Sequence, residues 1–532
     1  MYRKLRNFHF SIFLVFGVLA GFPALAFGGE DIHEPTEDQQ NDWNRFWEEG
    51  QSHKVMVNLS GEFKTATLAL VGVNVIPMTG EEILTDQTVL IEGGKFTTIG
   101  PAGEVDIPGE ANVITGASGK FMIPGLTEAH SHVQFSLSQF VVYLTRGVTT
   151  VREMDGFPWM LKAKEQADSG ELLIPNLYVA GHILSNRAWD FYMTQVNSGD
   201  EARQMVKEQA AMGYDFIKIH NSMPEPLFSA IFEAANGVGL DVVGHIPGEI
   251  LIKDAIAVGM RTNEHFKGYI FDETLTITDQ DYINATKGSD LWNAPSFANR
   301  HEHLRGKEAV VLATEENSLR LVPRWMRNSW LSQAAEEMTP LTELRQSIYP
   351  KSREIFLNLW PVTQKFFAGT DTGGYAFQVP GYALQEEVRI FESLGLTPFE
   401  ALQTATINSA LAMRKEAEMG TIEPGKRADF VILDDNPLEG TENLKSIWGV
   451  SVRGIWLHRD SLKGIENSLE AIFSDENVVP DISPETLETL VSEMETLKGH
   501  NFPTPDYALE EIETFLEDLG HPKLSARVAA LR

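Results

Sequence analysis

Six residues in the central part of the chain carry side chains that metal-dependent hydrolysis uses. Each lies at or just after a short apolar run that predicts a β-strand. They are His130, His132, Lys218, His245, His265 and Asp371. In a barrel of alternating strands and helices, the carboxyl ends of the strands meet at one mouth. The six residues therefore predict a metal site with two positions and a hydrolase that uses it.

The four histidines fall into two pairs. His130 and His132 lie two residues apart on a predicted strand, so both project from one face and suit one metal ion. His245 and His265 end successive predicted strands and would be neighbours at the mouth. Taken singly, each is also explained as an incidental or ordinary hydrogen-bonded histidine. The metal interpretation depends on the whole set.

Lys218 and Asp371 bring different chemistry. A protonated amine has no lone pair, so Lys218 can bind metal only when neutral or after reacting with carbon dioxide to form a carbamate. The alternative is a lysine that pairs with an acid near the mouth. Asp371, in the turn GTDTGG, can bind a metal ion and accept a proton from water. The glycines of this turn are expected to let a substrate approach the backbone.

The elements that would position these residues alternate between helices and strands. A helix is predicted over 200–212, with Gly213 as its end and a strand over 215–219 after it. Gly239 and Gly259 end two further predicted helices in the same way, each just before another apolar run. This repeat predicts an α/β fold with a (β/α)8 TIM barrel.

The barrel is predicted over residues 123–418. Its seventh and eighth strands are expected at 319–323 and 365–369, where short apolar runs recur. The polar stretch 271–318 is too long for a simple connection and is interpreted as a lid or substrate wall.

The flanks predict further parts of the protein. Alternating β patterns over 61–122 and 419–460 predict one small β-sandwich that is built from both flanks. Residues 27–60 are interpreted as a polar arm, and residues 461–532 as an acidic helical tail. That tail is a candidate for assembling a homo-oligomer.

Residues 1–26 have the pattern of a secretory signal peptide. A basic start is followed by an uncharged run over 8–22 and a small-x-small cleavage site at 24–26. The alternative is an uncleaved membrane anchor, although the apolar run is short for a spanning helix. We expect a secreted or periplasmic protein with no stable membrane insertion after cleavage.

Composition narrows the kind of site and partner. The chain of 532 residues has a formal net charge of −32, which argues against a nucleic-acid partner. It has no cysteine, so disulfides and thiolate metal sites are excluded and any metal ion must be held by nitrogen and oxygen. A small molecule is the expected partner.

Between residues 67 and 460 the chain resembles the amidohydrolase superfamily, in particular its binuclear imidazolonepropionase-like and prolidase-like branch. The motifs that carry the resemblance are IPGLTEAHSH, GVTTVRE, FIKIH, GHIPG, TNEHF and FAGTDTGG. The resemblance implies two divalent metal ions, usually zinc. It implies His130, His132 and Asp371 on one ion, His245 and His265 on the other, and a carbamate on Lys218 between them.

The resemblance also implies a reaction. Similar proteins cleave X-Pro or X-Arg dipeptides, N-acyl amino acids or cyclic amides. We therefore expect a metal-dependent amidohydrolase that cleaves a C–N bond in a dipeptide or N-acyl amino acid, with Asp371 moving the proton. One alternative is a cyclic amide or lactone hydrolase. An alternative of another class is a non-catalytic secreted binding protein.

One stretch departs from the pattern of the relatives. Many of them have Gly-Gly-His after the third strand, where this chain reads GHILSNRAWDFY. His182 and Arg187 in this stretch, and Tyr269 just past His265, are candidate substrate contacts. Arg187 could hold a substrate carboxylate through two hydrogen bonds, although it could equally be a surface arginine.

Overall fold

The computed structural model describes ten parts of the chain, and every structural statement below refers to them. They are residues 67–133, 137–187, 193–270, 279–299, 317–322, 327, 330, 340–373, 377–474 and 522–529. The predicted signal peptide, the polar arm and most of the acidic tail lie outside these residues. Those predictions therefore stay predictions.

Strands from both flanks form one mixed sheet of eight strands. It runs in the order β17-β16-β15-β5-β1-β2-β3, and β4 pairs with β1. The strands are β1 (Leu68–Val75), β2 (Leu84–Glu92), β3 (Lys95–Pro101), β4 (Asn112–Ile114), β5 (Phe121–Pro124), β15 (Phe430–Leu433), β16 (Ile447–Val452) and β17 (Ile455–His458). The antiparallel pair β5–β15 joins the early flank to the late one, as the sequence predicted. A two-layered sandwich with the predicted domain limits remains a prediction.

Two parallel sheets lie between the flanks in sequence. One has the order β6-β7-β8 and the other the order β10-β9-β11-β12-β13-β14. The strands are β6 (Leu126–Ser131), β7 (Val148–Glu153), β8 (Asn176–Val179), β9 (Ile183–Ser185), β10 (Met193–Gln195), β11 (Ile217–Ile219), β12 (Val242–Gly244), β13 (Thr262–Glu264) and β14 (Trp292–Ala294). Almost every residue of these strands is buried, which is typical of parallel sheets covered on both faces.

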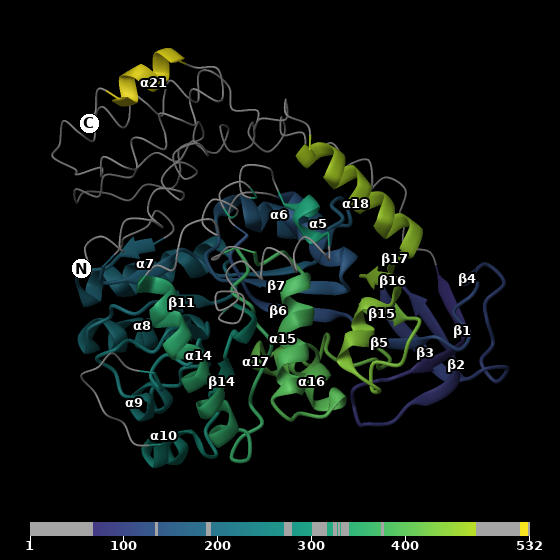
Figure 1. Cartoon of the computed structure of the whole chain (residues 1–532), viewed down its shortest axis with the longest axis horizontal. Helices are drawn as coiled ribbons and strands as arrows, with labels where there is room; N and C mark the ends of the chain where they lie inside the picture. The colour runs from purple at the N-terminus through teal and green to yellow at the C-terminus, as the bar shows by residue number, and fades with distance from the viewer. Residues whose placement is uncertain are drawn as a thin grey trace.

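Helices alternate with these strands, and Figure 1 shows α7 to α10 at the end of the molecule opposite the mixed sheet. They are α5 (Leu137–Thr145), α6 (Pro158–Asp168), α7 (Gly199–Met212), α8 (Glu225–Val238), α9 (Ile252–Ala257), α10 (Asp279–Thr286), α14 (Pro340–Leu359), α15 (Tyr382–Ser393), α16 (Pro398–Thr404), α17 (Ile407–Ala412), α18 (Arg459–Ser474) and α21 (Pro522–Ala529). Two short 3-10 helices are η1 (Ser318–Leu321) and η2 (Thr441–Lys445). Helices α7 and α8 end at Gly213 and Gly239, both in the left-handed conformation. These ends confirm the predicted helix-to-strand units.

The prediction of a strand over 319–323 is wrong. Most of this run lies in the 3-10 helix η1, where Leu319 and Leu321 are buried. The strand that follows β13 is β14, inside the stretch interpreted as a long connection. Three residues are too few to show strand periodicity, and the central one, Asn293, is polar. The amide oxygen of Asn293 accepts a hydrogen bond from Asn263 of β13, which allows this polar side chain to be buried. Phe366, in the run predicted as the last strand, forms a parallel bridge to Asn293.

An aromatic cluster packs behind the carboxyl ends of β13 and β14. Phe297 meets Phe266, Phe356 and Phe391 edge to face, with ring centroids 5.6–6.2 Å apart. All four rings are 0% exposed. Burying a phenylalanine side chain stabilises a fold by roughly 1.5–3 kcal/mol. The cluster therefore gives the loops after these two strands a rigid support.

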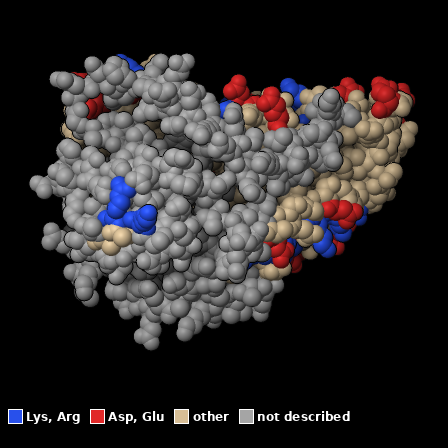
Figure 2. Space-filling model, turned by 90° about the horizontal axis from the view of Figure 1, so that it is seen from above, with Lys and Arg blue, Asp and Glu red and all other residues tan. Residues whose placement is uncertain are grey.

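The described surface adds two observations. None of the helices in the described part of the chain is both long enough and apolar enough to cross a membrane. Along the right-hand part of the face shown in Figure 2, described acidic and basic side chains lie near one another, and a small group of basic side chains stands apart from them on the left.

Candidate metal centre

Five imidazole rings form a continuous row across the ends of four strands. The ring centroids of His132 and His130 are 5.1 Å apart, those of His130 and His265 4.6 Å, and those of His265 and His245 5.2 Å. The row ends at His220, whose ring centroid is 4.2 Å from that of His245. The structure thus brings together the four histidines that the sequence singled out and adds one.

His220 is the histidine that the sequence interpretation missed. It stands two residues after Lys218 in the motif FIKIH, so both project from the same face of the strand. That spacing was the available signal. His220 is only partly buried, whereas Lys218 is 1% exposed.

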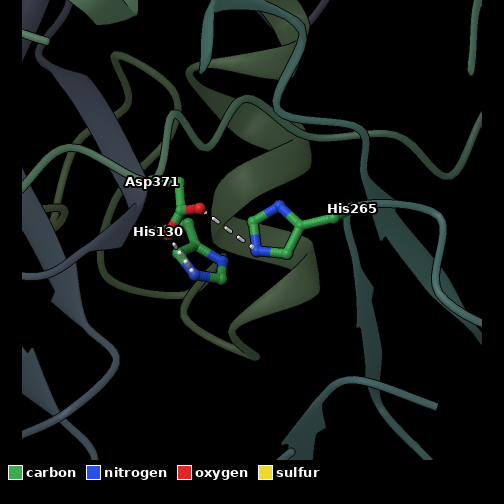
Figure 3. A group of neighbouring side chains, drawn as sticks. All are labelled: His130, His265 and Asp371. Carbon is green, nitrogen blue, oxygen red and sulfur yellow. Dashed lines mark ion pairs between the residues drawn. The ribbon is translucent and has the colours of Figure 1, made fainter. Parts of the chain in front are cut away.

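One group in the row can hold a metal ion. His130, His265 and Asp371 each offer a ligand atom, and these atoms lie within 4.8 Å of one another. Nε2 of His130 is 3.3 Å from Oδ1 of Asp371, and Nε2 of His265 is 3.6 Å from Oδ2. Figure 3 shows the carboxylate of Asp371 beside both rings, with an ion pair marked to each. All three residues are buried, at 0–9% exposure, so water competes little for these ligands.

The backbone around Asp371 is held in an unusual conformation. Asp371 has a φ of 66°, and its amide donates to the carbonyl of His130 at 2.9 Å. Its Oδ2 accepts a hydrogen bond of 2.8 Å from Nδ2 of Asn299. His265 also has a positive φ, of 57°. Left-handed conformations in non-glycine residues are costly, and two of the candidate ligands, Asp371 and His265, adopt them.

The glycines beside Asp371 make room for protein backbone. A Cβ added to Gly373 would lie 2.0 Å from the carbonyl oxygen of His132, and one added to Gly369 would lie 2.8 Å from Cβ of His130. The approach of a substrate to this turn stays a prediction. The two glycines let the 369–373 segment lie directly against the strand that carries both histidines.

We expect Gly373→Ala to destabilise the metal centre more than an ordinary turn substitution would. Both Gly373 and Gly213 have a φ above 90°, but a Cβ on Gly213 meets no atom within 4 Å. Gly213→Ala is therefore the matched control for the loss of the left-handed conformation. The collision should cost Gly373→Ala about 1–3 kcal/mol more unfolding free energy, measured by urea unfolding. Equal losses in the two variants would contradict this explanation.

Glu128 ties the two ligand-bearing segments together. Its carboxylate accepts hydrogen bonds from the amides of His130 and Thr370, at 3.1 and 2.9 Å, and from the Thr370 hydroxyl at 2.7 Å. Burial raises the pKa of Glu128 to about 7, although these hydrogen bonds oppose the rise. Glu128 thus holds the strand that carries His130 against the segment that carries Asp371.

A second group that can hold a metal ion is His132, Glu153 and Asp155. Nδ1 of His132 is 3.1 Å from Oδ2 of Asp155, and its Nε2 is 3.0 Å from Oδ1 of Asp371. Burial alone would lower the pKa of His132, but the charge of Asp155 and contacts with Asp371 raise it to about 10. This strongly anionic surrounding favours a cation at His132. Glu153 and Asp155 lie at and after the end of β7, in a motif whose acids the sequence interpretation did not use.

Lys218 is a buried amine without a hydrogen-bond partner among the described residues. Burial lowers the pKa of Lys218 to about 8, against the opposing charges of Glu264 and Asp371. A lysine that can lose its proton near neutral pH is able to react with carbon dioxide. The orphaned amine, next to a row of imidazoles, fits a carbamate and metal ions. It does not fit the alternative of a lysine paired with an acid.

His245 is oriented by a hydrogen bond to Asn221. Its Nδ1 lies 2.7 Å from Oδ1 of Asn221, which leaves Nε2 for another partner. Among the described residues, His245 and Lys218 belong to neither group of three. Their place in the metal site therefore remains a prediction, which the 5.2 Å between the ring centroids of His245 and His265 makes possible.

The sequence comparison decides the family. Residues 121–468 match the model of the amidohydrolase family, which is well over half of the chain. The chain belongs to the amidohydrolase family. This member of the family has a buried group, His130, His265 and Asp371, that could hold a metal ion.

Relatives of this amidohydrolase differ in substrate. An adenine deaminase of Mesorhizobium japonicum is 25% identical over 417 residues, which are 73% of this chain and 57% of the relative. The chain thus spans little more than half the length of that deaminase. A solved bottromycin amidohydrolase has a TM-score of 0.67 at 21% identity, covering 83% of this chain and 99% of the other. A solved Xaa-Pro dipeptidase with bound methionine has a TM-score of 0.57 at 19% identity, covering 74% of this chain and 100% of the other.

The candidate substrate contacts of the amidohydrolase lie in three different settings. His182 is partly buried, and its ring meets that of Phe157 edge to face at 5.2 Å. Burial lowers the pKa of His182, so its ring is neutral near neutral pH. Arg187 is exposed, and Tyr269 is 5% exposed with its hydroxyl 2.9 Å from that of Thr286. All three remain predictions, and Tyr269 has the position of a core residue.

Proposed function

We propose that this amidohydrolase uses two divalent ions, zinc being the expected metal, to cleave the amide bond of a dipeptide or an N-acyl amino acid. The observation that carries the proposal is the row of imidazoles, three of which lie beside Asp371, together with the amine of Lys218, which has no hydrogen-bond partner among the described residues. The solved Xaa-Pro dipeptidase among the structural neighbours supports this substrate class.

In this proposal the ligands divide between two ions. His130, His132 and Asp371 would hold one ion, and His245 and His265 the other, with a carbamate on Lys218 between them. Ions bound there would polarise a substrate carbonyl and make water easier to deprotonate. Nδ1 of His245 already faces Asn221, and Nδ1 of His265 lies 3.0 Å from the hydroxyl of Ser296. These contacts leave the Nε2 atoms for the ions.

Asp371 is proposed to move the proton. Burial opposes its ionisation, but the charge of His265 and contacts with His130 and His132 hold the pKa of Asp371 well below its usual range. The carboxylate is therefore ionised in the resting site, and in this proposal it accepts a proton from the attacking water and passes it to the leaving nitrogen. The hydrogen bond from Asn299 keeps the carboxylate turned towards the histidines during this transfer.

We also propose that the parallel strands close into a (β/α)8 barrel. Three isolated parallel bridges support closure. The bridge between Ala180 and Phe216 joins the two parallel sheets. The bridge between Asn293 and Phe366 adds the 366–372 segment, and the bridge between Ser131 and Thr372 joins that segment to β6. Closure would place the carboxyl ends of the strands, and all six predicted ligands, at one mouth.

The substrate class can be tested on one panel. The zinc-loaded protein would be assayed on X-Pro and X-Arg dipeptides, N-acyl amino acids, cyclic amides, lactones and adenine. We expect turnover of a linear substrate with a free carboxylate. Arg187→Ala should then raise KM about tenfold or more, since a charge-assisted pair contributes roughly 1.5–3 kcal/mol.

Each other outcome has a definite meaning. Turnover of a cyclic amide or lactone, with KM unchanged in Arg187→Ala, would favour the alternative hydrolase. Turnover of adenine would favour a deaminase, which the 25% identity to an adenine deaminase makes the second candidate. Silence of the zinc-loaded protein on every substrate would favour the non-catalytic binding protein.

We propose further that the mature protein acts in a secreted or periplasmic location. The support is the signal-peptide pattern of residues 1–26 and the absence of cysteine from the sequence. Mass spectrometry of the exported protein would test it, with a new N-terminus near residue 27 as the expected result.

A further inference from the structure

We infer that Arg152 and Glu264 are positioning residues for the metal centre. Through a buried chain of hydrogen bonds they determine which ring nitrogen of His130 is left for a metal ion. The inference rests on the proposed function, because it assumes that His130 binds metal. It assigns a role to two charged residues that the proposed reaction does not use.

The chain of contacts links three strands. Oε2 of Glu264, on β13, lies 2.9 Å from Nδ1 of His130, on β6. Oε1 of the same carboxylate accepts hydrogen bonds from Nη2 of Arg152, on β7, at 2.8 Å and from the Thr262 hydroxyl at 2.6 Å. The side chains of His130, Glu264 and Arg152 are 0–2% exposed.

Glu264 selects the tautomer of His130. Its carboxylate forms a buried ion pair with the guanidinium of Arg152 and accepts the Thr262 hydroxyl, so both contacts on Oε1 are those of an ionised acceptor. An ionised carboxylate only accepts hydrogen bonds, so Nδ1 of His130 must carry the proton. Nε2 then keeps its lone pair, and it is this atom that lies 3.3 Å from Asp371.

Arg152 keeps the carboxylate charged and fixed. An unpaired buried carboxylate would cost several kcal/mol and would take up a proton instead. Arg152 is itself held by its Nε, which donates to the carbonyl of Ala129 at 2.6 Å, and by the rings of Phe216 and Phe367 at 5.6 and 5.0 Å. Its guanidinium can only donate hydrogen bonds, and this property makes a sharp test possible.

In Glu264→Gln, Arg152 should force the amide into the wrong orientation. The amide oxygen must face the donors of Arg152, which turns the amide NH2 towards Nδ1 of His130. His130 then has to accept at Nδ1 and carry its proton on Nε2, where the metal ion would bind. Outer-shell changes of this kind typically reduce metal affinity about 10–100-fold.

The double variant Arg152→Met/Glu264→Gln separates positioning from mere packing. Without the guanidinium the amide can flip and present its oxygen to His130. Metal affinity should therefore recover relative to Glu264→Gln, even though the double variant has lost more buried contacts. If the two residues had a purely structural role, the double variant would have both a lower metal affinity and a lower unfolding temperature than Glu264→Gln.

The experiment is zinc titration against a chromophoric chelator, run beside thermal unfolding of the metal-free proteins. The matched control is Glu466→Gln, because Glu466 is also a buried glutamate paired with arginines, Arg146 and Arg320, away from the metal centre. We expect Glu264→Gln to lose about 10–100-fold in affinity for one ion, the double variant to regain part of it, and the control to bind zinc like the wild type.

Three results would overturn the inference. Wild-type affinity in Glu264→Gln would show that Glu264 does not set the tautomer. A double variant no better than Glu264→Gln would remove the role of Arg152. If the wild-type protein itself bound no zinc, the proposed metal-dependent function would fail as well, and this result is distinct from the other two.

Discussion

Asp371→Asn should lower kcat by about 10²–10⁴-fold on whichever substrate the wild-type protein hydrolyses. The amide of asparagine has the shape of the carboxylate but cannot accept the proton of the attacking water. It also removes a negative charge that lies 3.0–3.6 Å from the Nε2 atoms of three histidines. The measurement is kcat with the zinc content of each preparation determined beside it.

The matched control for this variant is Asp241→Asn. Asp241 forms an ion pair of 2.9 Å with Arg414 on the surface and contacts none of the predicted ligands. It should keep wild-type kcat. Wild-type kcat in Asp371→Asn would exclude Asp371 as the group that moves the proton. If the wild-type protein and Asp371→Asn were equally inactive on every substrate, a non-catalytic binding protein would be indicated instead.

Lys218→Ala should lose activity and metal together. A carbamate on Lys218 would supply the oxygens between the two ions, so its removal should reduce zinc per chain as well as turnover. Lys218→Met serves as a second variant, because it keeps a similar volume and removes only the amine. Since the amine has no hydrogen-bond partner among the described residues, Lys218→Met should not lower the unfolding temperature of the metal-free protein.

The carbamate itself has a separate test. Metal-free wild-type protein that is reloaded with zinc in carbon dioxide-free buffer should regain activity only after bicarbonate is added. The control for the Lys218 variants is Lys164→Ala, since Lys164 pairs with Asp215 and lies outside the ring row.

Full zinc occupancy in Lys218→Ala would refute a bridging role for Lys218.

The parts of this fold that could be predicted depend on local signals. Helices α7 and α8 end at Gly213 and Gly239 because a left-handed residue stops a helix, and this requirement is visible in the sequence. The polar motifs at the strand ends are also a local signal, because they directly follow runs of apolar residues. Strand β14 could not be predicted, since three residues with a polar centre carry no period of their own.

The support of the metal centre was less accessible to sequence reasoning. Glu264 precedes His265 in the chain, yet its carboxylate contacts His130. Arg152 lies in the motif GVTTVRE and Asp155 two residues after it, and their charges alone do not say which histidine each contacts. His220 carried a usable signal, its spacing from Lys218, that was not used.

The sequence by itself indicated the family and several of the side chains that gather at the candidate metal centre, because these follow from residue types at strand ends. Only the tertiary structure decided which of these side chains lie next to one another in the metal-free protein. His130 groups with His265 and Asp371, whereas Nδ1 of His132 faces Asp155. The physical reason is that parallel pairing brings together strand ends that are far apart in the chain, and the register of that pairing depends on packing over the whole molecule.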